Sequence, residues 1–221
     1  MLEHLEIKTS QSTDMNIVLI HGFGASMHDL TSLASEWSLP YHARFLFPNG
    51  PIRVDLGFGS HGQAWFKIDV AQFQQHLERG THKDFSQVRP KGLDEAVSKL
   101  DGWMKELELD PAQTVIGGFS QGAMVSLALA LESKASFKAL VQFSGQIFDE
   151  KWVRERLSKQ PAIPVFQSHG TKDNVLSFQG AEKLYECFEQ SDWSPLWMPF
   201  TGGHEIPLSV LRKSEEFLSG I

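Results

Sequence analysis

The sequence predicts an α/β protein with a mostly parallel, doubly wound sheet and helices on both faces of that sheet. The first observation is that short apolar runs of β type alternate with longer segments of helical periodicity, as is typical of parallel sheets. The second is composition: 41% of the 221 residues are hydrophobic, with no fixed-period repeat and no flexible linker. We therefore expect one domain spanning residues 1–221.

Six apolar runs are predicted to be strands. They are residues 16–20, 44–47, 114–116, 137–143, 163–168 and 194–199. Five segments are predicted to be helices, and in the second of them apolar residues recur every three or four positions. They are the residues after Gly24 up to about Trp37, then 91–109, 123–131, 177–189 and 206–218.

Residues 70–90 interrupt this alternation. The segment is polar and helical in its first half, yet it carries Phe73, Leu77 and Phe85. Two interpretations stay open, a structural insertion and a partial lid over the functional site. We expect little or no cap beyond this segment.

Charge and cysteine content limit the possible partners and compartment. The chain has 27 acidic and 20 basic residues, a net charge of −7, and one cysteine, Cys187. Nucleic acids and anionic membranes need a basic face, so neither is expected as a partner. The N-terminus does not resemble a signal peptide, and the longest apolar run, 123–131, is about half a membrane span. We expect a cytoplasmic monomer or homodimer without stable membrane insertion.

The pentapeptide Gly118-Phe119-Ser120-Gln121-Gly122 lies between a predicted strand and a predicted helix. In this strand–turn–helix setting, the serine of G-x-S-x-G becomes a nucleophile at a strained turn. Glycines two residues to either side suit such a turn, because they lack a Cβ.

Chain order selects partners for Ser120. In this fold an acid and then a histidine follow the nucleophile, each beyond the carboxyl end of a strand. Nine carboxylates lie between Ser120 and His204, and most sit on predicted helices. Asp149 with Glu150 is one remaining candidate, and Asp173, in a turn just past the strand 163–168, is the better one. His204, in a glycine-rich loop, is then the only histidine beyond the acid.

These residues predict a serine esterase. A serine hydroxyl is a poor nucleophile until a base such as His204 takes its proton, and Asp173 would hold the imidazole tautomer and stabilise the imidazolium. The backbone N–H groups of Gln121 and Phe23 are expected to bind the oxyanion of the tetrahedral intermediate.

At these residues the chain resembles the phospholipase/carboxylesterase family of small α/β-hydrolases, which includes the acyl-protein thioesterases. The matching blocks are residues 19–24, 48–51, 64–69, 117–123, His169-Gly170 with Asp173, and Gly203-His204. The resemblance implies an α/β-hydrolase fold without a cofactor, and Ser120, Asp173 and His204 as a catalytic triad.

The family further implies Phe23 and Gln121 as oxyanion-hole amides and Trp65 as a wall of the acyl pocket. The implied substrates are esters or thioesters with a short to medium acyl chain, such as lysophospholipids or acylated proteins. Two features depart from the family pattern: Phe23 stands where leucine is usual, and residues 70–90 are longer than expected.

Other signals carry less weight. His21 and His169 each precede a glycine at a strand end, and both are candidates to line the pocket. Residues 57–62 satisfy G-x-G-x-x-G but lack the strand and helix that a dinucleotide site needs, so we interpret them as a mobile loop at the pocket rim. Cys187 is expected to pack in the core, and no spacing suggests a metal. The alternative function is a catalytically silent hydrolase fold that binds a small molecule.

Overall fold

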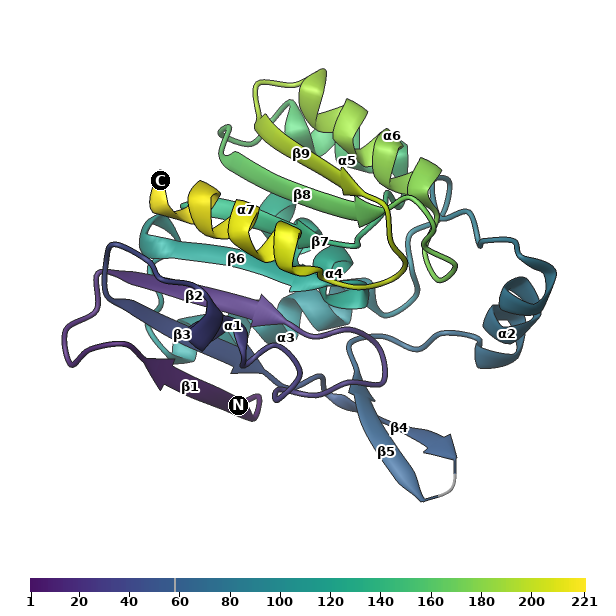
Figure 1. Ribbon diagram of the computed structural model, residues 1–221, viewed down its shortest axis with the longest axis horizontal. Coiled ribbons are helices and arrows are strands. Elements are labelled where there is room, and N and C mark those ends of the chain that lie inside the picture. The colour runs from purple at the N-terminus through teal and green to yellow at the C-terminus, as the bar shows by residue number, and fades with distance from the viewer. Residues whose placement is uncertain (58) are drawn as a thin grey trace.

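A seven-stranded sheet runs through the centre of the computed structural model, which describes residues 1–57 and 59–221 (Figure 1). The strand order is β1-β3-β2-β6-β7-β8-β9; β1 is antiparallel to β3, and the other five neighbouring pairs are parallel. The strands are β1 (His4–Lys8), β2 (Met15–Ile20), β3 (Ala43–Pro48), β6 (Thr114–Phe119), β7 (Ala139–Phe143), β8 (Pro164–Gly170) and β9 (Ser194–Phe200).

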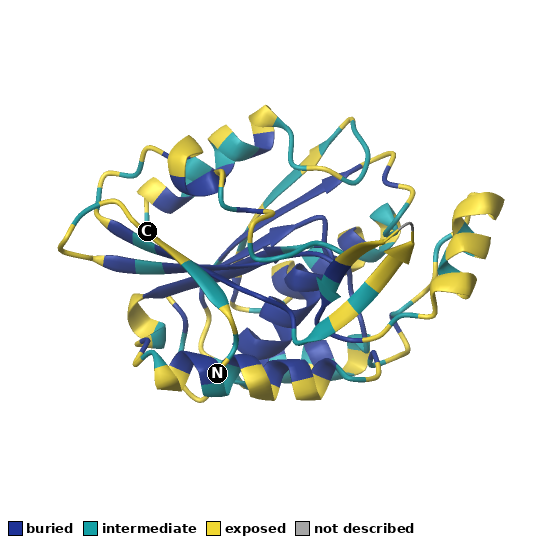
Figure 2. Ribbon diagram, turned by 90° about the horizontal axis from the view of Figure 1, so that it is seen from below, coloured by how far each residue is buried: buried dark blue, intermediate teal, exposed yellow. Residues whose placement is uncertain are grey.

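Helices cover both faces of this sheet, so the predicted fold class is confirmed (Figure 2). On one face lie α3 (Leu93–Glu106), α4 (Gln121–Glu132), α5 (Glu150–Leu157) and α6 (Phe178–Glu189). On the other lie α1 (Leu33–Glu36) and α7 (Leu208–Ser219). Both apolar clusters pack against the same sheet, which supports our proposal of one domain. A short 3₁₀ turn, η1 (Pro111–Gln113), precedes β6.

The central strands and α4 explain why the apolar runs could be recognised. Strand β2 is buried along almost its whole length, and every residue of α4 from Gln121 to Leu131 is buried. Strands buried on both faces by crossover helices are continuously apolar rather than alternating. The predicted strands and helices from residue 91 onward correspond to observed elements within a few residues at each end.

The predicted helix between Gly24 and Trp37 is wrong over most of its length, since only α1 is helical there. The start of this segment is instead bound to other segments through its backbone N–H groups. Gly24 N–H donates to Gln63 O at 2.8 Å, and Met27 N–H donates to the side chain of Asn49 at 3.2 Å. These contacts come from segments distant in sequence, so the local pattern does not reveal them.

Residues 52–64 form a hairpin, β4 (Ile52–Gly57) and β5 (Ser60–Ala64), that projects from the body of the molecule (Figure 1). The expected loop at residues 57–62 is therefore part of a β-hairpin; residue 58 lies outside the described residues. Gly62 packs so closely on the loop after β2 that a Cβ there would lie 1.9 Å from Gly24 O. Strand β1 was not expected from the sequence.

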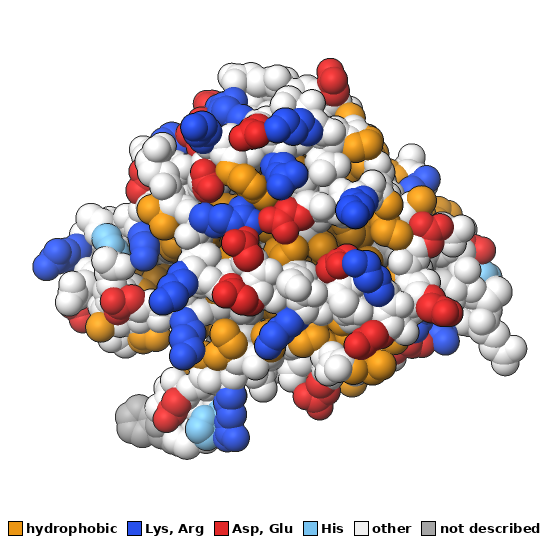
Figure 3. All heavy atoms as spheres, turned by 180° about the vertical axis from the view of Figure 1, so that it is seen from behind, with side chains coloured by type: hydrophobic (Ala, Val, Ile, Leu, Met, Phe, Trp, Pro, Cys, Tyr) orange, Lys and Arg blue, Asp and Glu red, His pale blue; other side chains and the backbone are white. Residues whose placement is uncertain are grey.

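The surface carries charges of both signs. On the face shown in Figure 3, Lys and Arg side chains are interspersed with Asp and Glu side chains. Over the described residues, each helix is too short or too polar to cross a lipid bilayer.

Candidate active site

Ser120 occupies a strained turn between β6 and α4. Its φ of 57° and ψ of −116° are unusual for a residue with a side chain, and such conformations persist only where the surroundings enforce them. The Ser120 N–H donates to Phe143 O at 2.9 Å. A Cβ on Gly122 would lie only 2.0 Å from Ile20 O, so the turn packs against the end of β2 as closely as a glycine permits.

Asp173 and His204 lie side by side, from the loops that follow β8 and β9. His204 Nδ1 is 2.6 Å from Asp173 Oδ2. The other carboxylate oxygen, Oδ1, accepts the N–H groups of Val175 at 2.8 Å and Leu176 at 2.9 Å. Burial by itself raises the pKa of the Asp173 carboxyl. The hydrogen bonds from His169, His204 and the Leu176 N–H outweigh that effect and hold this pKa well below its usual range.

The contact with Asp173 determines the state of the His204 ring. A carboxylate oxygen only accepts, so Nδ1 carries a proton and Nε2 of a neutral ring keeps its lone pair. The ring packs against Phe119, the residue before Ser120, with ring centroids 4.7 Å apart. His204 is therefore oriented by its contacts with the Asp173 carboxylate and with the partly buried Phe119 ring.

Ser120 and His204 line the same cavity, which has a volume of about 610 Å³. Phe23 and Gln121, the expected oxyanion-binding residues, line it too. Much of the rest of its wall is apolar. The apolar side chains include Phe66, Ile68, Phe73, Leu77, Phe85, Val88, Met124, Val175 and Leu176.

The backbone N–H groups of Phe23 and Gln121 are available at this cavity. Among the hydrogen bonds of the described residues, neither N–H has an acceptor. Gln121 is the first residue of α4, where the helix dipole places partial positive charge. Two free donors beside a serine form an arrangement that can bind an oxyanion.

The alternative acid has a different role in the fold. The Asp149 side chain accepts the Trp152 N–H at 3.3 Å and so caps the N-terminus of α5. Glu150 forms an ion pair with Arg154 at 2.9 Å. Both carboxylates thus have local partners within α5.

Trp65 and His21 do not reach the cavity, although the sequence analysis placed them at the pocket. Each is only 1% exposed, and their neighbours Phe66 and Gly22 form the wall instead. Trp65 Nε1 donates to His21 O at 3.1 Å. The Gln121 side chain completes this support, since its Oε1 accepts Trp65 N–H at 2.8 Å and its Nε2 donates to Phe66 O at 2.9 Å.

His21 holds the loop after β2 in place as a neutral ring. Its Nδ1 lies 2.7 Å from Gly22 O, and its Nε2 accepts the Gly50 N–H at 2.9 Å. Burial lowers the pKa of His21 to about 4. The neutral form is the one that can accept from Gly50, so the hydrogen bond and the burial agree.

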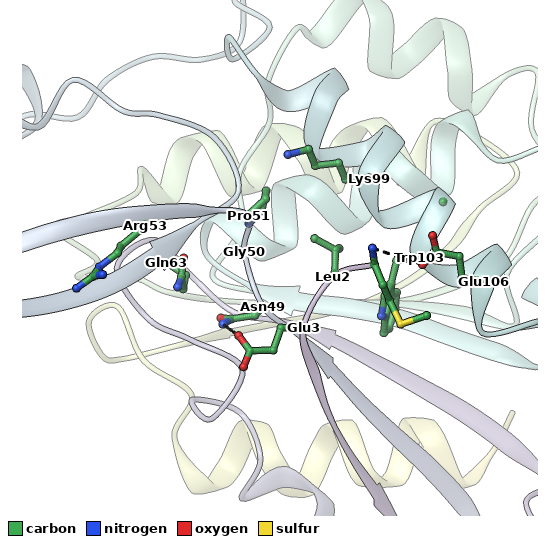
Figure 4. Close-up of a pocket in the computed structure, with 12 residues that line it drawn as sticks. Leu2, Glu3, Asn49, Gly50, Pro51, Arg53, Gln63, Lys99, Trp103 and Glu106 are labelled. Carbon is green, nitrogen blue, oxygen red and sulfur yellow. Dashed lines mark hydrogen bonds and ion pairs between the residues drawn. The ribbon is translucent and has the colours of Figure 1, made fainter.

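Gly50 also lines a second cavity, of about 630 Å³ (Figure 4). Its side chains carry both signs of charge, among them Glu3, Lys99 and Glu106. Asn49 Nδ2 donates to Glu3 Oε2 at 3.1 Å. The triad candidates line the other cavity or lie next to it, so we place the candidate site there.

Two further groups complete the description of reactive side chains. Cys187 is buried on α6, and burial raises the pKa of its thiol to about 11, so it remains protonated in the core. In the part of the chain that the structure describes, no three His, Cys, Asp or Glu side chains gather as metal ligands would.

The chain is similar over its whole length to known esterases. A family model described as phospholipase/carboxylesterase matches residues 2–221. Acyl-protein thioesterase 1 of Kluyveromyces lactis is 28% identical over 231 residues, which cover 99% of this chain and 97% of that protein. The protein of the same name from Yarrowia lipolytica is 30% identical over 172 residues, or 73% of this chain and 70% of that protein.

Solved structures of esterases and thioesterases are similar to this chain as well. The crystal structure of esterase PE8 matches with a TM-score of 0.80 and 28% identity, covering 100% of this chain and 99% of that one. Acyl-protein thioesterase 2 of Zea mays matches with a TM-score of 0.74 over 100% of this chain and 99% of that one. At 20% identity this second match shows the fold alone.

The burial of His21 predicts a pH-dependent stability. The pKa of His21 falls from 6.5 to about 4 on folding, so between these pH values the unfolded chain binds a proton that the folded chain rejects. The free energy of unfolding should therefore decrease as the pH falls through this window, by about 3 kcal/mol from this residue. Urea unfolding at pH 7, 5.5 and 4 measures the loss. His21→Gln should be less stable at pH 7 and lose less on acidification; equal losses in both proteins would contradict the assignment.

Proposed function

Because this chain belongs to the phospholipase/carboxylesterase family and is a serine hydrolase that cleaves esters or thioesters, we propose that Ser120, His204 and Asp173 are its catalytic triad. The observation that carries the proposal is the 2.6 Å contact between His204 and Asp173 beside a cavity that Ser120 and His204 share. The strained backbone of Ser120 supports it.

The reaction begins when His204 Nε2 takes the proton of Ser120 and Ser120 Oγ attacks the carbonyl carbon of the ester. The resulting oxyanion binds the N–H groups of Gln121 and Phe23. His204 then protonates the leaving alcohol or thiol, and an acyl-enzyme remains. Water, activated by the same histidine, attacks this acyl-enzyme, and Ser120 leaves with the returned proton.

The two amide donors contribute most where negative charge develops. Each donor of this kind is worth roughly 3 kcal/mol of transition-state stabilisation in related sites. Asp173 remains ionised throughout and stabilises the imidazolium that forms on His204. The lowered pKa of Asp173 supports that role, because its carboxylate is then charged at every pH at which His204 is a base.

The substrate that we propose carries a short to medium, uncharged acyl chain. The apolar side chains of Phe66, Ile68 and Met124 in the cavity wall favour an acyl chain over a polar group. The relatives named acyl-protein thioesterase 1 support thioesters of acylated proteins as one substrate class, and lysophospholipids remain the other class that we propose.

Residues 70–90 are proposed to form a partial lid. Helix α2 (Val70–Arg79) presents Phe73 and Leu77 to the cavity, and Phe85 and Val88 follow from the same segment. Every residue of α2 is half-buried or exposed, so the helix lies over the cavity rather than in the core. His82 Nε2 contacts Asp173 O at 2.9 Å and joins the segment to the acid loop.

The remaining proposals concern the setting of the enzyme. We propose a cytoplasmic monomer or homodimer that acts on small ester or thioester substrates without a cofactor. The net charge of −7 supports the absence of a nucleic-acid partner.

Covalent labelling tests the nucleophile. A fluorophosphonate probe should label the wild-type protein and leave Ser120→Ala unlabelled, because Ser120 Oγ is the atom that attacks phosphorus. Ser133→Ala, at the far end of α4, is the matched control and should label normally. Equal labelling of Ser120→Ala, read from the intact mass, would show that another residue reacts.

The acid is tested by a pair of isosteric changes. Asp173→Asn should keep the fold, since Asn can still accept the Val175 and Leu176 N–H groups, and should lower kcat by up to about 10⁴-fold through the wrong His204 tautomer. Asp149→Asn should keep both its cap and its activity. Steady-state kinetics with a p-nitrophenyl ester distinguish the two, and the reverse pattern would move the acid to the loop after β7.

The lid is tested with a series of p-nitrophenyl esters of increasing acyl length and one matching thioester. Phe73→Ala should lower kcat/KM by about 10-fold for medium chains and much less for acetyl, because it removes apolar contact with the chain. Gln75→Ala, on the exposed side of α2, should resemble the wild type. An unchanged length preference in Phe73→Ala would favour a structural insertion.

A further inference from the structure

A second histidine contacts the proposed catalytic acid. His169 lies near the end of β8, four residues before Asp173, and its side chain is fully buried. Its Nε2 is 3.2 Å from Asp173 Oδ2, the same oxygen that His204 contacts. His169 takes no part in the acyl-transfer steps that we propose.

Both ring nitrogens of His169 face oxygen atoms that only accept hydrogen bonds. Nδ1 is 3.1 Å from Gly145 O, the carbonyl of the loop after β7. Nε2 is 3.1 Å from Leu176 O in addition to its contact with Asp173. Both are backbone carbonyl oxygens, which can accept a hydrogen bond from the ring but cannot donate one to it.

A neutral imidazole cannot satisfy these positions. It has one N–H and one lone pair, so either tautomer would direct a lone pair at an oxygen in a site closed to water. A buried polar atom without a partner is costly, and two facing acceptors repel each other. The doubly protonated ring donates to Gly145 O and Leu176 O at once, and the Asp173 carboxylate offsets its charge.

We propose that His169 is a doubly protonated positioning residue that holds the Asp173 carboxylate and keeps a positive charge beside the His204 ring. The proposal rests on the proposed triad. The Asp173 carboxylate then has four donors, two from backbone N–H groups and two from imidazoles, so its orientation toward His204 is fixed on every side.

The proposed positive charge on His169 lies close to the His204 ring. His169 Nε2 and His204 Nδ1 both contact Asp173 Oδ2, so these two nitrogen atoms lie within about 6 Å of each other. A cation this close disfavours a second cation. The imidazolium that forms on His204 in the reaction therefore gives its proton to the leaving group more readily.

Among the described residues, Asp173 is the charged group in direct contact with His169. From the loop after β9 come His204 and Glu205, whose carboxylate accepts the Gly203 N–H at 3.1 Å. His82 approaches Asp173 from the 70–90 segment. From α6, Phe178 faces the His169 ring with centroids 6.1 Å apart. Asp173 is thus the group that balances the charge on His169.

Nuclear magnetic resonance of the wild-type protein tests the protonation state directly. The protein is labelled with ¹⁵N at histidine and measured at pH 7, and His169 is assigned by contacts of its ring protons with Phe178. We expect both ring nitrogens of His169 to show the imidazolium signature. A signature with one protonated and one bare nitrogen would overturn the proposal, whether or not any variant folds.

The pH profile of kcat/KM tests the effect on His204. His169→Gln retains an amide donor but loses the charge, so we expect the acid limb of its profile to move to higher pH by about one unit or more. If His169 had only a structural role, the substitution would lower the maximum value of kcat/KM and leave the pH of the acid limb unchanged. His42→Gln, the same change at an exposed histidine, should retain the wild-type limb.

Fluorophosphonate labelling separates the two proposals. If Ser120→Ala loses the label while His169→Gln keeps the wild-type acid limb, the role of His169 is wrong and the triad stands. If Ser120→Ala is still labelled, Ser120 is not the nucleophile and the proposed triad is wrong, whatever the pH profile of His169→Gln.

Discussion

The contact between Gly122 and the carbonyl oxygen of Ile20 is the constraint on which the candidate site depends. It brings the N-terminus of α4 against the end of β2, so the turn at Ser120 and the loop carrying Phe23 meet at one edge of the sheet. Parallel strands make this edge possible, because their carboxyl ends all face the same side. A larger residue at position 122 would separate the serine from one of the two amides near it.

Asp173 organises the other half of the site by charge rather than by close packing. Burial alone would favour its neutral form, yet its donors reverse that preference. The carboxylate thereby joins the loop after β8 to the loop after β9, and the backbone carbonyl oxygen of the same residue contacts His82 of the 70–90 segment. Asp173 thus connects three segments that are far apart in the sequence, two of them through its charge.

The nucleophile turn, the acid and the histidine could be predicted from the sequence because each depends on a local pattern or on the order of residues along the chain. The apolar runs of β2 and β6, the G-x-S-x-G turn, and the order of Ser120, Asp173 and His204 are all visible in one dimension. Trp65 and His21 were placed too near the substrate, since a motif shows that residues belong to a site but not which atoms face the cavity. The turns before Trp37 and the β4–β5 hairpin depend on hydrogen bonds between distant segments, in which Asn49 Oδ1 and Gln63 O are acceptors. The importance of His169 was also hidden, because only the structure shows oxygen atoms on both sides of its ring.

Gln121 performs two tasks with different parts of one residue. Its N–H is the expected oxyanion donor, while its amide side chain binds the backbone at Trp65 and Phe66. The wall at Phe66 and the expected oxyanion site therefore cannot shift independently: a change that widens the cavity on this side would also displace the donor. Room for new substrates has to come from the opposite side, where α2 lies outside the core. The architecture thus separates a half held by the sheet, which carries the candidate nucleophile and its expected donors, from a half that α2 forms outside the core.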